Sequence, residues 1–169
     1  LNTGNELMDV GTNASPFMVD YDNNGAADLL VGNGEGLVYY YANRGSNTDP
    51  VFSSPIIIDK LDGTPVAVGS DCKPCVVDWN GDDRKDLLLG NGSGTLVLSL
   101  NEGTDHHPLF SSMRPLRAGK KVISADGSSA PCSVDWNADG HTDLLLVTGS
   151  GYIDVYYTND GQREASVSA

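Results

Sequence analysis

Three short segments rich in aspartate are the part of this sequence best suited to chemistry. Each follows the spacing Asp-x-Asp/Asn-x-Asp/Asn-x-x-x-Asp, which directs oxygen side chains at alternate positions into a tight turn. A backbone carbonyl at the seventh position and water can complete a shell of oxygen ligands. Such a shell suits Ca2+, because Mg2+ prefers fewer protein ligands and strict octahedral geometry. The sequence predicts up to three calcium ions per chain, held by Asp20, Asp22, Asn24, Ala26 and Asp28; by Asp78, Asn80, Asp82, Arg84 and Asp86; and by Asp135, Asn137, Asp139, His141 and Asp143.

Other interpretations of these segments fit less well. An EF-hand or dockerin loop needs an acidic residue at position twelve, where this chain has Val31, Leu89 and Leu146. Asp, Asn and Gly also mark ordinary hairpin turns, but three copies in register disfavour that explanation. Gly25 and Gly140 stand where the chain must turn sharply, whereas the second segment has Asp83 there. Occupancy of the second loop therefore stays open.

The aspartate segments belong to a longer repeat. Their first residues, Asp20, Asp78 and Asp135, are 58 and 57 residues apart. A Gly-x-Gly turn, a β-rich run and an Asn-x-Gly motif follow each segment, and copies one and two then share Pro-x-Phe. A fixed period of this length indicates a propeller, a solenoid or an array. We place the repeats at approximately 14–70, 71–128 and 129–169 of a single domain, 1–169.

Each repeat is expected to form four short strands. The Leu-Leu run after each aspartate loop is apolar at consecutive positions, as in a strand covered on both faces. No stretch has a 3.6-residue apolar period with caps, so helix should be nearly absent. These features predict an all-β fold, a β-propeller made of four-stranded antiparallel blades with three repeats per chain. The third copy is expected to stop after its third strand, leaving residues 1–13 as a strand that completes the last blade.

Charge and composition exclude several classes of function. The net charge of −13 argues against binding to nucleic-acid backbones, which need clustered Lys and Arg. No apolar run is long enough to cross a membrane, and no signal peptide is visible. Because the chain begins at Leu1, we expect a processed or excised piece, for which a missing leader says nothing about secretion. A local disulfide between Cys72 and Cys75 is open, and a redox site is not expected.

The aromatic and histidine residues could suggest sugar binding, zinc binding or catalysis, but their positions in the repeat disfavour these functions. Tyr21, Trp79 and Trp136 share the second loop position, where they would stack on a sugar or, as we expect, pack against the adjacent blade. The three histidines have no partner that recurs between copies and are expected in exposed loops. No catalytic motif is recognisable. We therefore predict that the chain is not an enzyme.

The combined pattern Asp-x-Asn-x-Asp-Gly-x-x-Asp-Leu-Leu, followed by Gly-x-Gly and Asn-x-Gly, resembles the FG-GAP/VCBS repeat along essentially the whole chain. Such repeats form propeller blades in integrin α-chains, in a fungal lectin and in bacterial surface proteins. The resemblance implies a secreted or cell-surface, calcium-bound propeller, but not one activity.

The predicted function is extracellular glycan or protein binding, of lectin or adhesion type. The alternative is a non-catalytic or substrate-binding part of a secreted carbohydrate-active enzyme such as a polysaccharide lyase. Three blades are fewer than a propeller needs, because each blade packs between two neighbours. We therefore expect a homodimer that closes a six-bladed ring, or neighbouring blades in a longer parent chain.

Overall fold

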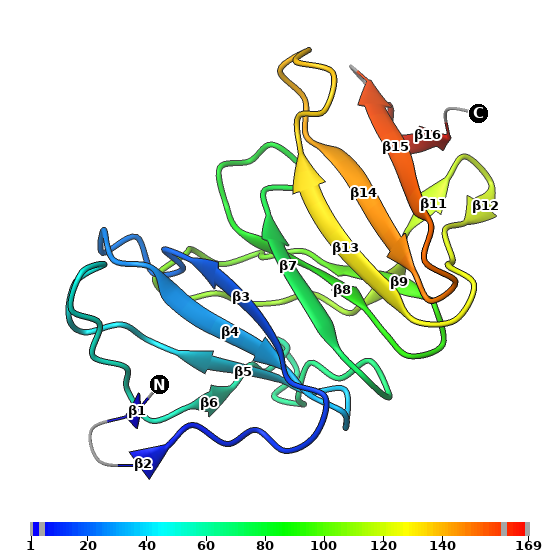
Figure 1. Ribbon diagram of the computed structural model, residues 1–169. Coiled ribbons are helices and arrows are strands. Elements are labelled where there is room, and N and C mark those ends of the chain that lie inside the picture. The colour runs from blue at the N-terminus through cyan, green and yellow to red at the C-terminus, as the bar shows by residue number, and fades with distance from the viewer. Residues whose placement is uncertain (1, 4–5, 160–161, 168–169) are drawn as a thin grey trace.

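The computed structural model describes residues 2–3, 6–159 and 162–167, and the regular structure of this part is β-strand without helix. Three four-stranded antiparallel sheets dominate the chain, and each connects its strands in sequence order (Figure 1). Two small hairpins accompany them. The first sheet has β3 (Ser15–Val19), β4 (Asp28–Gly32), β5 (Val38–Tyr41) and β6 (Ile56–Ile57); the second has β7 (Lys73–Val77), β8 (Asp86–Gly90), β9 (Leu96–Ser99) and β10 (Arg114–Pro115); the third has β13 (Ser129–Val134), β14 (Asp143–Thr148), β15 (Ile153–Asn159) and β16 (Gln162–Val167); the hairpins are β1 (Asn2–Thr3) with β2 (Glu6–Leu7) and β11 (Arg117–Ala118) with β12 (Lys121–Val122).

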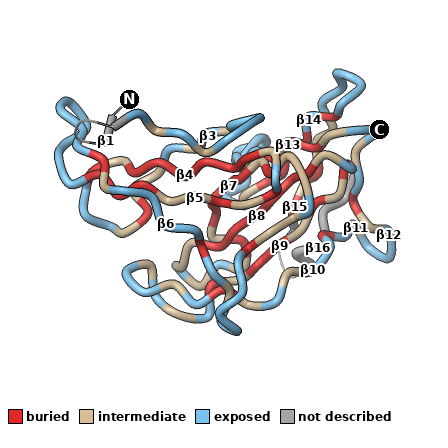
Figure 2. The backbone as a smooth tube through the Cα atoms, turned by 90° about the horizontal axis from the view of Figure 1, so that it is seen from below, coloured by how far each residue is buried: buried red, intermediate tan, exposed pale blue. Residues whose placement is uncertain are grey.

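The second strand of each sheet is the most deeply buried, which confirms the expectation drawn from its consecutive apolar residues. Every residue of β4 and of β8 is buried, and both strands run through the buried interior in Figure 2. Because side chains alternate between faces, Leu30 and Leu88 point towards the next sheet along the chain, and Leu29 and Leu87 towards the opposite side. The all-β, antiparallel prediction is therefore confirmed at the level of the individual sheets.

The three sheets stack with their first strands adjacent. β7 contacts β3 on one side and β13 on the other. A core cluster around Leu30, Val38 and Leu89 joins the first and second sheets, and a cluster around Leu88, Leu98 and Leu144 joins the second and third. The two larger apolar cores thus lie between the sheets, and a smaller cluster around Leu29, Val31 and Tyr41 lies on the outward face of the first sheet.

Glycine permits the close approach of consecutive sheets. A Cβ on Gly32 would lie 2.1 Å from the backbone oxygen of Cys72, and one on Gly90 would lie 2.2 Å from that of Ser129. The same backbone bonds join both pairs of sheets: Cys72 donates to Asn33 at 2.9 Å, and Ser129 donates to Asn91 at 3.0 Å. The two joints are copies of one another.

The third sheet differs from what the sequence pattern suggests. Its fourth strand is β16, which pairs with β15 through Tyr156 and Val167, so the place expected for residues 1–13 is filled from the same unit. Eight residues follow Gly161 in the sequence, enough for a return strand. At the other end of the chain, Met8 and Val10 pack on the outward face of the first sheet.

The outward face of the third sheet is exposed. Trp136 is 57% exposed and Ile153 is 63% exposed, and Cys132 is exposed where its counterpart Cys75 is buried. Val147, 42% exposed, occupies the position that is Gly32 or Gly90 in the other sheets. All three cysteines are free thiols, and burial raises the pKa of Cys72 to about 12, so this thiol is less readily ionised than an exposed one.

Candidate metal centres

Each aspartate loop connects the first and second strands of its sheet: 20–27 follows β3, 78–85 follows β7 and 135–142 follows β13. The first aspartate organises the turn by accepting two backbone N–H bonds. Asp20 accepts from Asn24 and Gly25, both at 2.9 Å. The same pair of bonds recurs at Asp78, from Asp82 and Asp83, and at Asp135, from Asp139 and Gly140. These bonds explain why Asp is required at position one without any metal.

The last aspartate of each loop is completely buried. Asp28, Asp86 and Asp143 each accept one bond from the backbone of loop position two and one from a residue fifteen places further on. For Asp28 these donors are Tyr21 at 2.9 Å and Asn43 at 2.7 Å. Asn101 and Thr158 take the second role in the other copies. The aspartate thus fastens the loop to the end of the third strand, a role that sequence reasoning did not assign to these partners.

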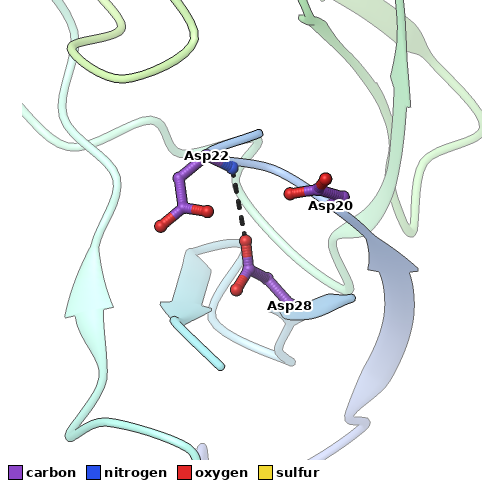
Figure 3. A group of neighbouring side chains, drawn as sticks. All are labelled: Asp20, Asp22 and Asp28. Atoms are coloured by element: carbon purple, nitrogen blue, oxygen red, sulfur yellow. Dashed lines mark hydrogen bonds between the residues drawn. The ribbon is translucent and has the colours of Figure 1, made fainter. Parts of the chain in front are cut away.

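The first loop gathers three carboxylates. One oxygen each of Asp20, Asp22 and Asp28 lie within 4.8 Å of one another, and Figure 3 shows the three side chains around a common space. Arg44 approaches Asp22 at 3.5 Å, but its side chain is largely exposed. Three carboxylates this close repel one another unless a cation or protons neutralise them. Within the described residues, no other loop brings three acidic, histidine or cysteine side chains together in this way.

The second loop contains an internal cation. The guanidinium of Arg84 contacts the Asp82 carboxylate, to which the Asn80 amide also donates at 2.7 Å. Burial, together with the neighbouring Asp82 and Asp78 carboxylates, raises the pKa of Asp86 despite two backbone hydrogen bonds. A divalent cation at this loop would oppose each of those causes, because it would favour the charged carboxylate.

The third loop repeats the second without the arginine. Asn137 donates to Asp139 at 2.8 Å, and Asp139 accepts the backbone N–H of His141 at 2.9 Å. These two bonds, that of His141 first, lower the pKa of Asp139. The five predicted ligand positions of each loop, four side chains and one carbonyl, therefore share one loop geometry, but a cation would compete with the amide nitrogens of Asn80 and Asn137 for the same carboxylates.

Positive φ angles recur at the fourth and sixth positions of all three loops. Asn23 and Gly25 have φ values of 58° and 87°, Gly81 and Asp83 of 68° and 62°, and Ala138 and Gly140 of 58° and 86°. The second loop therefore adopts the same turn as the others, with Asp83 in the left-handed region in place of glycine. The missing glycine does not set this loop apart.

Replacing Gly140 by alanine is expected to lower the free energy of unfolding by about 1–2 kcal/mol. No atom lies within 4 Å of a Cβ added there, so the cost comes from the left-handed backbone alone. Gly140→Asn is the matched control and should cost less, because asparagine tolerates this region. Chemical denaturation measures both variants, and equal losses would contradict the backbone explanation.

A model of the FG-GAP-like repeat matches residues 20–89 and 78–146 of the chain. The chain belongs to this family. Comparison with curated proteins and with solved structures gave no match. FG-GAP-like repeats are typical of extracellular proteins, and the described part of this chain has no helix that could span a membrane.

Aromatic residues at the second loop position of the FG-GAP-like repeats have different surroundings. Tyr21 and Trp79 are buried in the two clusters between sheets, as expected for packing. Trp136 is 57% exposed, because among the described residues no further sheet packs on the outward face of the third. His106 and His107 are exposed, as predicted, while His141 is half-buried. The two tryptophans therefore differ in exposure because Trp79 has a neighbouring sheet packed against it and Trp136 does not.

A polar link between FG-GAP-like units escaped the sequence analysis. The Lys85 ammonium contacts the Asn23 side chain of the first loop and the Asp105 carboxylate at 2.8 Å, and Asn23 donates to Asp105 at 2.9 Å. Burial opposes ionisation of Asp105, but bonds from Lys85 and Asn23 outweigh it and lower the pKa. No pattern within one repeat reveals this contact, because its members come from two.

Arg84→Ala is expected to raise the calcium affinity of the second loop about three- to tenfold, because it removes a competing cation and keeps the backbone carbonyl. A gain of this size corresponds to the roughly 1 kcal/mol of a partly exposed ion pair. Calorimetric calcium titration should be done in an Asp20→Ala, Asp135→Ala background. Arg114→Ala, an exposed cation away from the loops, is the control, and an unchanged affinity in Arg84→Ala would refute the competition.

Proposed function

We propose that the chain is a calcium-stabilised binding module that recognises a glycan or a protein outside the cell and performs no catalysis itself. The observation that carries the proposal is the first loop, where oxygens of Asp20, Asp22 and Asp28 lie within 4.8 Å of one another. Hard oxygen donors of this number and charge are what Ca2+ prefers. Family membership adds support, because FG-GAP-like repeats are typical of adhesion-type extracellular domains.

The residues present fit calcium. The side chains of Asp20, Asp22, Asn24 and Asp28 and the carbonyl of Ala26 would hold the first ion, and the equivalent residues the second and third. Bound calcium supplies positive charge that neutralises the carboxylates. The chain's own contribution is to hold those carboxylates in place: Asp28 is tied by Tyr21 and Asn43, so the loop is attached to the core before any ion arrives.

The sheets are proposed to be consecutive blades of a propeller. Support comes from the adjacent first strands β3, β7 and β13 and from two joints with the same glycine contact and the same backbone bond. A repeated joint rotates each sheet by a similar step, which is how blades advance around a channel. The outer faces of the first and third sheets would then meet further blades, in a second copy or in a longer parent chain.

A glycan array, together with an array of extracellular protein ectodomains, tests the binding role. Each should be probed with the labelled chain in 2 mM calcium (a chosen assay condition on the order of extracellular site affinities) and again in EDTA. We expect calcium-dependent binding to a restricted set of targets that Asp20→Ala weakens and that Glu35→Ala, which removes one exposed carboxylate elsewhere, preserves. Binding to neither array would overturn the proposal.

A further inference from the structure

A groove of about 410 Å³ lies between the first and second sheets beside the first aspartate loop. Its floor is formed by Tyr21, Tyr40 and Phe110, with the two tyrosine rings 4.8 Å apart. One wall is β6, and the other is the connection at 105–110 from the second unit. The groove therefore exists only where two repeats meet.

The walls expose large apolar side chains. Ile56 of β6 is 60% exposed, and Leu109 on the facing wall is 46% exposed. In the second sheet Arg114 and Pro115 stand where β6 has Ile56 and Ile57. The exposed isoleucines are thus not a requirement of the repeat, and they make this groove unlike its counterpart at the next joint.

The groove is acidic at its rim. Asp22, Asp59 and Asp105 line it together with His106 and His107, and no lysine or arginine does. Lys85 pairs with the Asp105 carboxylate, and Arg44 lies 3.5 Å from that of Asp22. Asp59, by contrast, forms no ion pair within the described part of the chain. The chain as a whole carries a net charge of −13. A complementary ligand has an apolar body and a positive charge.

Backbone groups at the groove favour an extended peptide over other cations. β6 is the edge strand of the first sheet, and the N–H of Ile58 donates to Val38 in β5 at 3.0 Å. Because backbone bonding directions alternate along a strand, the N–H and C=O of Ile57 point away from β5, on the open edge. An extended ligand can pair with such an edge and place alternate side chains in a pocket.

We infer that the groove binds an extended segment of a partner protein that carries a basic side chain between bulky apolar ones, an inference that rests on the binding role proposed above. The apolar side chains contact Ile56, Ile57 and Leu109, and the basic group lies beside Asp59. A neutral sugar would leave the free carboxylate without a counter-charge and the isoleucine walls without an apolar partner.

The test uses the calcium-loaded full chain and the peptide Ac-Thr-Ile-Arg-Ile-Thr-amide, followed by methyl NMR of the five isoleucines. We expect saturable shifts at Ile56 and Ile57 with a dissociation constant below about 1 mM, and none at Ile123 or Ile153. Asp59→Asn and Ile56→Ser should each weaken binding about fivefold, and 0.5 M salt should weaken it further. Ile153→Ser, an equally exposed isoleucine on the third sheet, is the matched control and should bind as the parent does.

Three outcomes overturn the inference. The first is that the methyl signals of Ile56 and Ile57 do not shift when the Arg peptide is added. The second is that the peptide with Glu in place of Arg binds equally well. The third is that neutral disaccharides shift the same methyl signals and the Arg peptide does not. The last result assigns the groove to glycans and leaves the proposed binding role intact. Failure of the peptide alongside a hit on either array separates this inference from the role itself.

Discussion

Removing calcium with EDTA is expected to lower the melting temperature more than any single substitution in a loop. A site saturated at 100 times its dissociation constant contributes about 2.7 kcal/mol, provided that the unfolded chain does not bind the ion. For a chain of this length each kcal/mol shifts the melting temperature by about 2–4 °C. The loss of one site therefore corresponds to roughly 5–10 °C, and the loss of all three to several times that.

Asp20→Ala separates the contribution of the first calcium site to thermal stability from the contributions of the other two sites. It removes a carboxylate of the first cluster and also the two backbone bonds that Asp20 accepts. We expect it to abolish the first site's share of the calcium-dependent shift and leave the rest, while its melting temperature in EDTA falls by the cost of the lost bonds. Glu35→Ala controls for the change in net charge. Scanning calorimetry with and without calcium measures both, and identical curves with and without EDTA would refute calcium binding.

Much of the fold follows from the sequence because the repeat makes each pattern visible three times. The apolar runs at Leu29–Val31 and Leu87–Leu89 predict strands covered on both faces, and those strands are buried throughout. The loops also follow, because positions one and nine need acceptors for backbone N–H groups in every copy. Metal ligation and turn formation select the same residues, which is why the loops alone do not distinguish these two requirements.

Contacts between repeats could not be predicted in this way. The link from Lys85 to Asn23 joins residues 62 positions apart in different units. The groove at Ile56 depends on a wall supplied by the next repeat. The exposure of Trp136 reflects a missing neighbour, while Trp79 at the same repeat position is buried. A periodic sequence specifies the repeated unit, whereas the deviations from the period specify which surfaces are joined and which remain open.

Gly32, Gly90 and Val147 show how such a deviation bears on assembly. The two glycines let the backbone of the following sheet approach, at Cys72 and Ser129. In the first unit the corresponding residue is Ala14. If a second copy met the third sheet through the same joint, its Ala14 would face Val147, whose Cβ occupies the space left free elsewhere. Gly90→Val should correspondingly lower the free energy of unfolding by about 1–3 kcal/mol or more, because the backbone at Ser129 must shift to make room.

Val147→Gly is therefore expected to strengthen self-association. The proposed six-bladed ring joins the third sheet of one copy to the first sheet of another, and it covers apolar residues such as Trp136 and Ile153 that are otherwise exposed. Removing the obstructing side chain at two joints should lower the dissociation constant of the dimer by at least about tenfold, equivalent to 1.4 kcal/mol. Light scattering and sedimentation at micromolar concentration measure it, with Val51→Gly, an exposed valine of the first unit, as the control. A parent chain that stays monomeric would rule out the dimeric ring. A Val147→Gly variant that also stays monomeric would show that the outer face of the third sheet does not accept a second copy through this joint.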